Sequence, residues 1–186
     1  PPGLSFNAIS KKALAAYEKA TLPRSYWDWG EHIDSNSAGA FPYTPATNLL
    51  FGLNEAILML KEEGLDNVFK RHKRYAEATR LAVQTWGLEV LCENKDDFSN
   101  TLTAVLLPEG HNADEFRSIV LDNFNMSLGN GLSRLAGKVF RIGHLGDFND
   151  LMLVATLGGI EMGLAKSSVP HQVGGTQAAM QFLKQN

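Results

Sequence analysis

The spacing of apolar residues predicts three helices in the first half of the chain. They cover residues 10–19, 46–63 and 66–86. Ser10 can cap the first helix, and Gly64 and Gly87 follow the second and third as helix-ending residues. The basic run at residues 70–74 lies in the third helix, and we expect it to form a solvated face.

Residues 24–46 have a different pattern. They combine proline and glycine with a polar run at residues 34–37 and with five aromatic side chains, Tyr26, Trp27, Trp29, Phe41 and Tyr43. We expect a long ordered loop here. Loops of this length are uncommon in compact domains and are often functional.

From residue 88 onward, short apolar runs replace the helical spacing. They predict strands at residues 88–93, 101–107, 126–128 and 139–142. Helices are predicted at residues 113–124, from 147 or 149 to 166, and at 177–184, with Asn112 capping the first of them. The order strand, strand, helix, strand, strand, helix is typical of helices packed on one face of a small antiparallel or mixed sheet.

Composition excludes several classes of function. The 186 residues carry a formal net charge of −3 and are 44% hydrophobic, which is ordinary for a soluble globular protein and provides no basic patch for nucleic acid. No apolar stretch approaches the roughly 20 residues that span a bilayer, so no membrane partner is expected. The histidines have no cysteine at a metal-ligand spacing, and Cys92 lies in an alternating run, so we expect no metal site and a buried cysteine.

Arg141 is the candidate binding residue that this pattern singles out. It interrupts the apolar run 139–142 and is followed by a segment with two glycines, residues 143–146. Strand alternation places its side chain opposite those of Phe140 and Ile142. A guanidinium in such a place needs an anion, and a carboxylate bound in bidentate geometry satisfies it. The alternative is an internal ion pair with one of the 20 acidic residues.

Four phrases of the sequence, taken together, resemble one protein family. They are Pro-Pro-Gly-Leu-Ser-Phe at residues 1–6, Phe-Pro-Tyr-Thr-Pro at 41–45, Glu-Glu-Gly-Leu-Asp-Asn-Val at 62–68 and Gly-Lys-Val-Phe-Arg-Ile-Gly-His at 137–144. In this order and over essentially its whole length, the chain resembles the class V, fold type I aminotransferases. The nearest likeness is to the serine–glyoxylate and alanine–glyoxylate aminotransferases, whose cofactor is pyridoxal 5'-phosphate.

The resemblance implies an α/β fold and a division into three parts. Residues 1–64 would be the end of the large cofactor domain with an interface loop, residues 65–87 a connecting helix, and residues 88–186 a small C-terminal α+β domain with helices packed on one sheet. It also implies a homodimer with shared active sites. The last residues, Leu-Lys-Gln-Asn at 183–186, form no peroxisomal address, so we expect a cytoplasmic location. Such an enzyme transfers the amino group of a small amino acid, serine or alanine, to the 2-oxo acid glyoxylate.

The resemblance also assigns roles to single residues. The family holds the substrate α-carboxylate with the arginine of the Arg-Ile-Gly phrase, which implies this role for Arg141, and Gly143 would allow close approach of the substrate. Thr44 matches a threonine that touches the cofactor phosphate from the neighbouring subunit, although its hydroxyl could instead cap the following helix. A tyrosine often found three residues earlier is replaced by Phe41, and Tyr43 is the displaced candidate for that contact.

The lysine that carries the cofactor in this family would fall just before Pro1, so no catalytic residue is expected in the chain. Lys11 and Lys12 lie in the first helix and cannot replace it, and His144 is expected to be structural. We therefore expect the C-terminal portion of an aminotransferase that is inactive alone. The alternative is a non-catalytic binding or oligomerisation module that keeps the small-domain fold.

Overall fold

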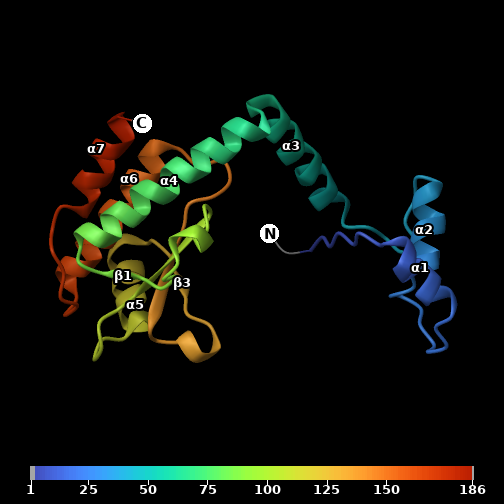
Figure 1. Cartoon of the computed structure of the whole chain (residues 1–186), viewed down its shortest axis with the longest axis horizontal. Helices are drawn as coiled ribbons and strands as arrows, with labels where there is room; N and C mark the ends of the chain where they lie inside the picture. The colour runs from blue at the N-terminus through green and yellow to red at the C-terminus, as the bar shows by residue number, and fades with distance from the viewer. Residues whose placement is uncertain (1–2, 186) are drawn as a thin grey trace. The chain divides into compact units, whose positions relative to one another are not determined.

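A computed structural model describes residues 3–185 and shows two compact units, divided between Glu63 and Gly64 (Figure 1). Pro1 and Pro2, which open the first of the four phrases, lie outside the described residues. None of the helices in residues 3–185 combines the length and the apolar character needed to cross a membrane.

The first unit contains three helices: α1 (Lys11–Glu18), α2 (Trp29–Ser37) and α3 (Thr47–Glu63). α1 and α3 confirm the helices predicted from apolar spacing. Ser10 caps α1 as expected, because its hydroxyl accepts a hydrogen bond from the backbone N–H of Ala13 at 3.2 Å. No side chain in residues 3–63 is buried, and α3 exposes several large apolar side chains.

The expectation of a single long loop over residues 24–46 is wrong, because α2 lies within it. Asp28 starts this helix by accepting hydrogen bonds from the backbone N–H groups of Gly30 and Glu31, at 2.8 and 3.2 Å. The Asp-x-x-Glu spacing typical of a helix N-terminus was the available signal. Gly30 and the polar run 34–37 obscured it, because these residues have low helix propensity.

The second unit is an α+β domain. Its elements are α4 (Leu65–Thr85), β1 (Glu89–Val90), the 3-10 helix η1 (Lys95–Asp97), β2 (Leu102–Leu106), α5 (Ala113–Phe124), β3 (Gly129–Asn130), the 3-10 helix η2 (Ser133–Leu135), β4 (Val139–Gly143), α6 (Asp150–Lys166) and α7 (Gly175–Gln185). The strands form one antiparallel sheet in the order β1-β2-β4-β3. This confirms the predicted order of elements and the predicted class, helices on a small sheet.

Two strands and one side chain differ from the sequence prediction. β1 stops at Val90 as the chain leaves the sheet towards η1, although the N–H of Leu91 still donates to the carbonyl of Ala104 at 2.9 Å. The strand predicted at residues 126–128 is not formed there, because β3 covers only Gly129–Asn130. Cys92 lies just beyond β1 and is partly exposed, so the expectation of a buried cysteine is wrong.

The core of the second unit lies between the sheet and the helices. Phe140 and Ile142 of β4 are fully buried, and Phe140 packs against Phe116 of α5 with ring centroids 4.9 Å apart. The register pairs Ile142 with Thr103 and Phe140 with Val105 of β2, which are also buried. Each large apolar side chain buried in this way stabilises the fold by roughly 1.5–3 kcal/mol. Because strand residues alternate between faces, the residues between these point away from the helices.

Glu161 of α6 fixes the N-terminus of α7. Its carboxylate accepts hydrogen bonds from the backbone N–H of Gly174 and, at 2.8 Å, from that of Thr176. Burial opposes ionisation of this carboxyl, but the hydrogen bonds from Thr176 and Gly174 outweigh it and lower its pKa to about 2. Such bonds satisfy N–H groups that have no partner within the helix. Glu161 is thus an acidic cap supplied by a neighbouring helix.

Replacing Glu161 by Gln is expected to destabilise the protein by about 1 kcal/mol at neutral pH, because the charged acceptor is lost. The folded-state pKa is depressed below its ordinary value of 4.5, so this stabilisation is complete above pH 4.5. It is lost as the pH falls towards about 2, and the stabilities of the two proteins should converge there. Chemical denaturation of both proteins over this pH range measures the difference.

Glu77→Gln is the matched control, because this exposed carboxylate makes only a 3.9 Å ion pair with Lys73. Its stability should stay within about 0.5 kcal/mol of the wild type. An E161Q deficit that persists unchanged at acid pH would contradict the capping role.

Candidate functional site

Arg141 lies in the middle of β4, on the sheet face opposite the core. Phe140 and Ile142, its neighbours in the strand, point into the core, so alternation directs Arg141 away from it. The antiparallel register places Ala104 of β2 on one side of Arg141 and Gly129 of β3 on the other. The orientation expected from the sequence is therefore confirmed.

Small residues surround Arg141 on this face. Besides Ala104 and Gly129 on the adjacent strands, Gly143 lies two positions further along β4. A Cβ atom at position 143 would come no closer than 3.5 Å to Leu145, an ordinary contact, and Gly143 does not have a left-handed backbone. The fold itself would accept a side chain there. The effect of this glycine is to leave space beside the guanidinium.

The guanidinium of Arg141 has no partner within residues 3–185. Its Nε is buried and makes no hydrogen bond, and none of the ion pairs of the described chain includes it. The internal ion pair considered as an alternative is therefore not formed. A buried polar group without a partner costs about 1–3 kcal/mol, so such groups are rare and need an explanation.

His144, directly after β4, is a fully buried structural residue. Its Nδ1 lies 3.2 Å from the carbonyl of Asn100, and its Nε2 lies 2.9 Å from the hydroxyl of Thr103. A carbonyl oxygen can only accept, so Nδ1 carries the proton and Nε2 accepts from Thr103. Burial lowers the pKa of this imidazole to about 4, against the opposing hydrogen bond to Asn100, so it stays neutral at physiological pH. His144 therefore anchors the end of β4 to β2.

The basic run at residues 70–74 is not simply a solvated face, and this expectation is wrong. Arg71 donates to the carbonyls of Gly146 and Phe148, at 2.8 and 3.3 Å. Arg74 forms a bidentate pair with Asp150, at 2.7 and 2.9 Å, and this pair lowers the pKa of the carboxyl. α4 thus fixes the segment that connects β4 to α6.

His72 adds a third contact from α4 to the same segment. Its Nδ1 lies 2.7 Å from the carbonyl of Val68, and its Nε2 accepts the backbone N–H of Gly146 at 3.2 Å. The carbonyl of Val68 can only accept, so Nδ1 is the donor in that contact and Nε2 is the acceptor in the other. The chain after Arg141 is therefore held from two sides, by β2 and by α4.

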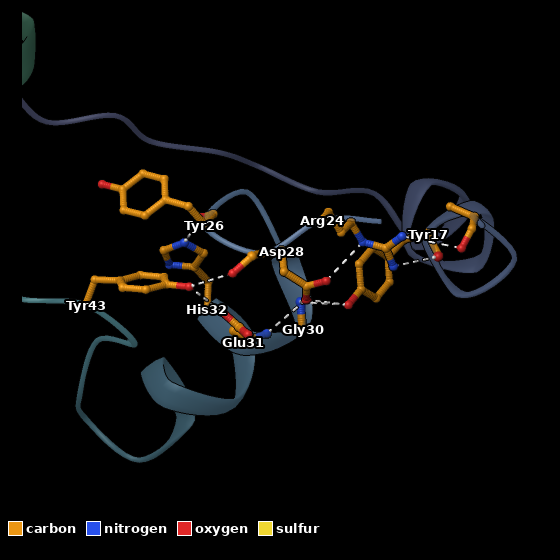
Figure 2. A network of polar contacts seen from close by, with 10 residues as sticks. Tyr17, Arg24, Tyr26, Asp28, Gly30, Glu31, His32 and Tyr43 are labelled. Carbon is orange, nitrogen blue, oxygen red and sulfur yellow. Dashed lines mark hydrogen bonds and ion pairs between the residues drawn. The ribbon is translucent and has the colours of Figure 1, made fainter. Parts of the chain in front are cut away.

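Tyr43 and Thr44 lie in the first unit, just before α3. The phenol of Tyr43 donates to the carboxylate of Glu31 at 2.9 Å, as Figure 2 shows. The first helical bond of α3 joins the N–H of Leu50 to the carbonyl of Ala46, so Ala46 and not Thr44 is the cap residue. The hydroxyl of Thr44 is exposed and has no hydrogen-bond partner within residues 3–185.

A polar network stabilises the segment that carries Tyr43. Tyr17 of α1 donates to Asp28 at 2.6 Å, and Arg24 makes an ion pair with the other oxygen of Asp28 at 3.0 Å (Figure 2). The hydrogen bond from Tyr17, followed by those from the start of α2 and the charge of Arg24, lowers the pKa of Asp28 despite its partial desolvation. Tyr26 packs its ring 4.9 Å from that of Tyr43. These contacts join α1, α2 and the Tyr43 segment.

Two hollows of the second unit adjoin Arg80 and Phe98, with volumes of about 560 and 220 Å³. Concave pockets are the usual places for ligands, yet neither of these is lined by Arg141 or Gly143. Arg80 is already engaged, because it donates to the carbonyl of Ser99 at 3.2 Å and stacks 4.7 Å from the ring of Phe98. The candidate carboxylate site is therefore on the open sheet face.

Known proteins match the chain closely over its whole length. It is 44% identical over 192 residues to the serine–glyoxylate aminotransferase of Methylorubrum extorquens, covering 100% of this chain and 48% of that protein. It is 40% identical over 181 residues to the L-aspartate–glyoxylate aminotransferase of Paracoccus denitrificans, covering 97% of this chain and 46% of that one. The crystal structure of ureidoglycine–glyoxylate aminotransferase from Bacillus subtilis matches with a TM-score of 0.83 and 26% identity, over 93% of this chain and 45% of that one.

The chain is similar over its whole length to class V aminotransferases. It spans about half the length of the curated relatives it matches and corresponds to their C-terminal half. No family model matches it. The family and the fold type expected from the four phrases are thus confirmed.

The chain brings its candidate site residues together in two separate pairs. Arg141 and Gly143 share one face of β4, and Tyr43 and Thr44 share the segment before α3. The sequence predicts either an ordered loop near the site or a plain strand connection for Asn130 and the glycines around it, and the structure shows Gly129 in β3 as the cross-strand neighbour of Arg141. The available signal was weak, because a two-residue strand leaves little alternating pattern to place it in register.

Replacing Thr103 by Val is expected to destabilise the fold by about 1–3 kcal/mol, because Nε2 of His144 then stays buried without a donor. Chemical denaturation measures the loss. Thr156→Val is the matched control, since it removes the same hydroxyl from a partly exposed helical position, and we expect a change within about 0.5 kcal/mol. Equal stability of T103V and T156V would show that the Thr103–His144 hydrogen bond does not contribute to the stability of the fold.

Proposed function

We propose that this chain is the C-terminal half of a pyridoxal-phosphate-dependent aminotransferase that transfers the amino group of a small amino acid to glyoxylate. One observation carries the proposal. In a chain homologous to aminotransferases, an arginine with no partner within residues 3–185 lies on the sheet face opposite the core, beside small residues. This arrangement offers a strong, geometrically specific site for a carboxylate.

The substrate carboxylate binds Arg141 in this proposal. A guanidinium recognises a carboxylate by two parallel hydrogen bonds, which fix the substrate in orientation as well as in place. Gly143 supports the proposal because the fold does not require a glycine there, while a bound substrate does need the space. The end of the strand that carries Arg141 is anchored by the Thr103–His144 contact and by His72.

Thr44 fits a contact to the cofactor phosphate better than Tyr43 does. A phosphate accepts hydrogen bonds, so its partners must donate. The hydroxyl of Thr44 is exposed and uncommitted, whereas the proton of the Tyr43 phenol is already donated to Glu31. We therefore assign Thr44 as the phosphate contact and Tyr43 as a residue that shapes the segment. When bound, the cofactor supplies an electron sink that makes the Cα proton of the amino acid removable.

The amino donor is assigned only as a small amino acid. The three relatives described above are named for different donors, which are serine, L-aspartate and ureidoglycine, and all three are named for glyoxylate. Each of these donors carries an α-carboxylate that an arginine can bind. Glyoxylate is therefore the better supported substrate, and the choice between serine and alanine as donor stays a prediction.

A homodimer with shared active sites completes the proposal. α3 is apolar nearly all round, and exposed side chains on it include Phe51, Ile57, Leu58, Met59 and Leu60. A helix of this kind is stable in water only when it is packed against other protein. The larger cofactor domain and the partner subunit are the surfaces we propose for it, which treats residues 1–64 as the end of that domain and residues 65–87 as its connection.

The cofactor assignment predicts the result of a mass measurement. The natural gene product that contains this chain is incubated with pyridoxal phosphate, treated with borohydride to fix the cofactor covalently, and digested. We expect the cofactor mass on a lysine preceding Pro1, with none on Lys11 or Lys12. A product that takes up no cofactor supports the non-catalytic module instead.

The carboxylate role of Arg141 predicts a loss of donor affinity when the guanidinium is removed. Arg141→Ala in the intact aminotransferase should weaken binding of the amino donor by on the order of 2–4 kcal/mol, because a charge-assisted bidentate contact is lost. Cofactor affinity should not change. Donor titration and cofactor titration measure the two effects.

Arg134→Ala is the matched control, because Arg134 is an exposed arginine in the nearby helix η2. It should leave both affinities unchanged. Unaltered donor affinity in the R141A protein would rule out the carboxylate role.

A further inference from the structure

Gly129 makes the closest approach to Arg141 in the sheet. The two residues are paired across β3 and β4. A Cβ atom built on Gly129 would lie 3.0 Å from the Cβ of Arg141, 3.1 Å from its Nε and 3.6 Å from its Cζ. The arginine side chain therefore passes directly over the backbone of Gly129, in space that any other residue would fill.

The backbone of β3 does not explain this glycine. Gly129 has no left-handed φ, unlike Gly64 at +83° or Gly87 at +76°, so an alanine could adopt its conformation without strain. Contact with backbone does not explain it either, since the atoms nearest to the added Cβ belong to the Arg141 side chain. In the described structure, glycine at 129 is explained by the path of that side chain alone.

This path decides which edge of the guanidinium a ligand reaches. Nε is buried against Gly129 and has no hydrogen-bond partner. The two Nη atoms also lack a partner within residues 3–185 but are not among the buried unpaired atoms, so they form the accessible edge. A carboxylate therefore meets Arg141 end-on, at its two Nη atoms.

We propose that Gly129 is a positioning residue for the carboxylate site. Because it lacks a Cβ, Gly129 lets the Arg141 side chain lie flat across β3 and presents the Nη edge to the substrate. The inference rests on the proposed function, since it concerns the same site. It adds a residue that touches neither substrate nor cofactor and acts only through Arg141.

Gly129→Ala in the intact aminotransferase tests the inference. The added methyl group forces the arginine to shift by a few tenths of an ångström. We expect the KM of the amino donor to rise about tenfold, because the bidentate geometry is misaligned, with kcat changing less than about threefold. The KM of glyoxylate should rise in parallel, because it also carries a carboxylate, and cofactor affinity should stay the same.

A double-mutant comparison separates positioning from general damage. In an Arg141→Ala background, Gly129→Ala should have no further effect on the KM of the donor, because the residue through which it acts is gone. Gly158→Ala is the matched control: an added Cβ at Gly158 meets only a side-chain carbon of Thr176 at 4.0 Å. It should leave both KM values unchanged.

The outcomes distinguish failure of the inference from failure of the proposed function. If R141A raises the KM of the donor and G129A does not, the positioning role is refuted and the carboxylate role stands. If G129A raises KM equally in the presence and absence of Arg141, the glycine acts on the fold and the inference is refuted. If R141A itself has no effect, the proposed function of the site fails first.

Discussion

The antiparallel register between β2 and β4 is the constraint on which the second unit depends. It pairs Ile142 with Thr103 and Phe140 with Val105, and so places four side chains in the core together. A slip of one residue would turn every side chain of β4 to the other face and bury a guanidinium beneath the helices. Such a charge, desolvated and unpaired, costs several kcal/mol, so the register and the outward direction of Arg141 specify one another.

The contacts at the end of β4 preserve this register without involving Arg141. His144 is held by β2, and the segment after it is held by Arg71 and His72 of α4. These side chains pair with backbone groups of the segment and, for His144, with Thr103, and none of these contacts involves the guanidinium of Arg141. Within residues 3–185 the guanidinium of Arg141 therefore has no acceptor although it lies on an anchored strand, an arrangement expected where a ligand supplies the missing acceptor.

The sequence predicted the helices and the order of strands, because apolar spacing and caps such as Ser10 are local signals. It also predicted the direction of Arg141, since alternation needs only the strand itself. It did not predict α2, where Asp28 overrides weak helix propensity, or the role of the basic run, whose acceptors lie some 75 residues away in the chain. Contacts across that separation depend on the tertiary fold, which no local pattern contains.

The glycines of the site show why its shape is harder to predict than its charge. Gly64 and Gly87 have left-handed φ values and are required by the backbone, so helix-ending patterns identify them. Gly129 and Gly143 have no such φ and serve by leaving space on the face of Arg141. A glycine that acts by lacking a side chain adds nothing to the apolar pattern of the sequence and makes no side-chain hydrogen bond. The role of such a glycine becomes visible only when the atoms near an added Cβ are known. These atoms depend on how the strands pair in the folded sheet.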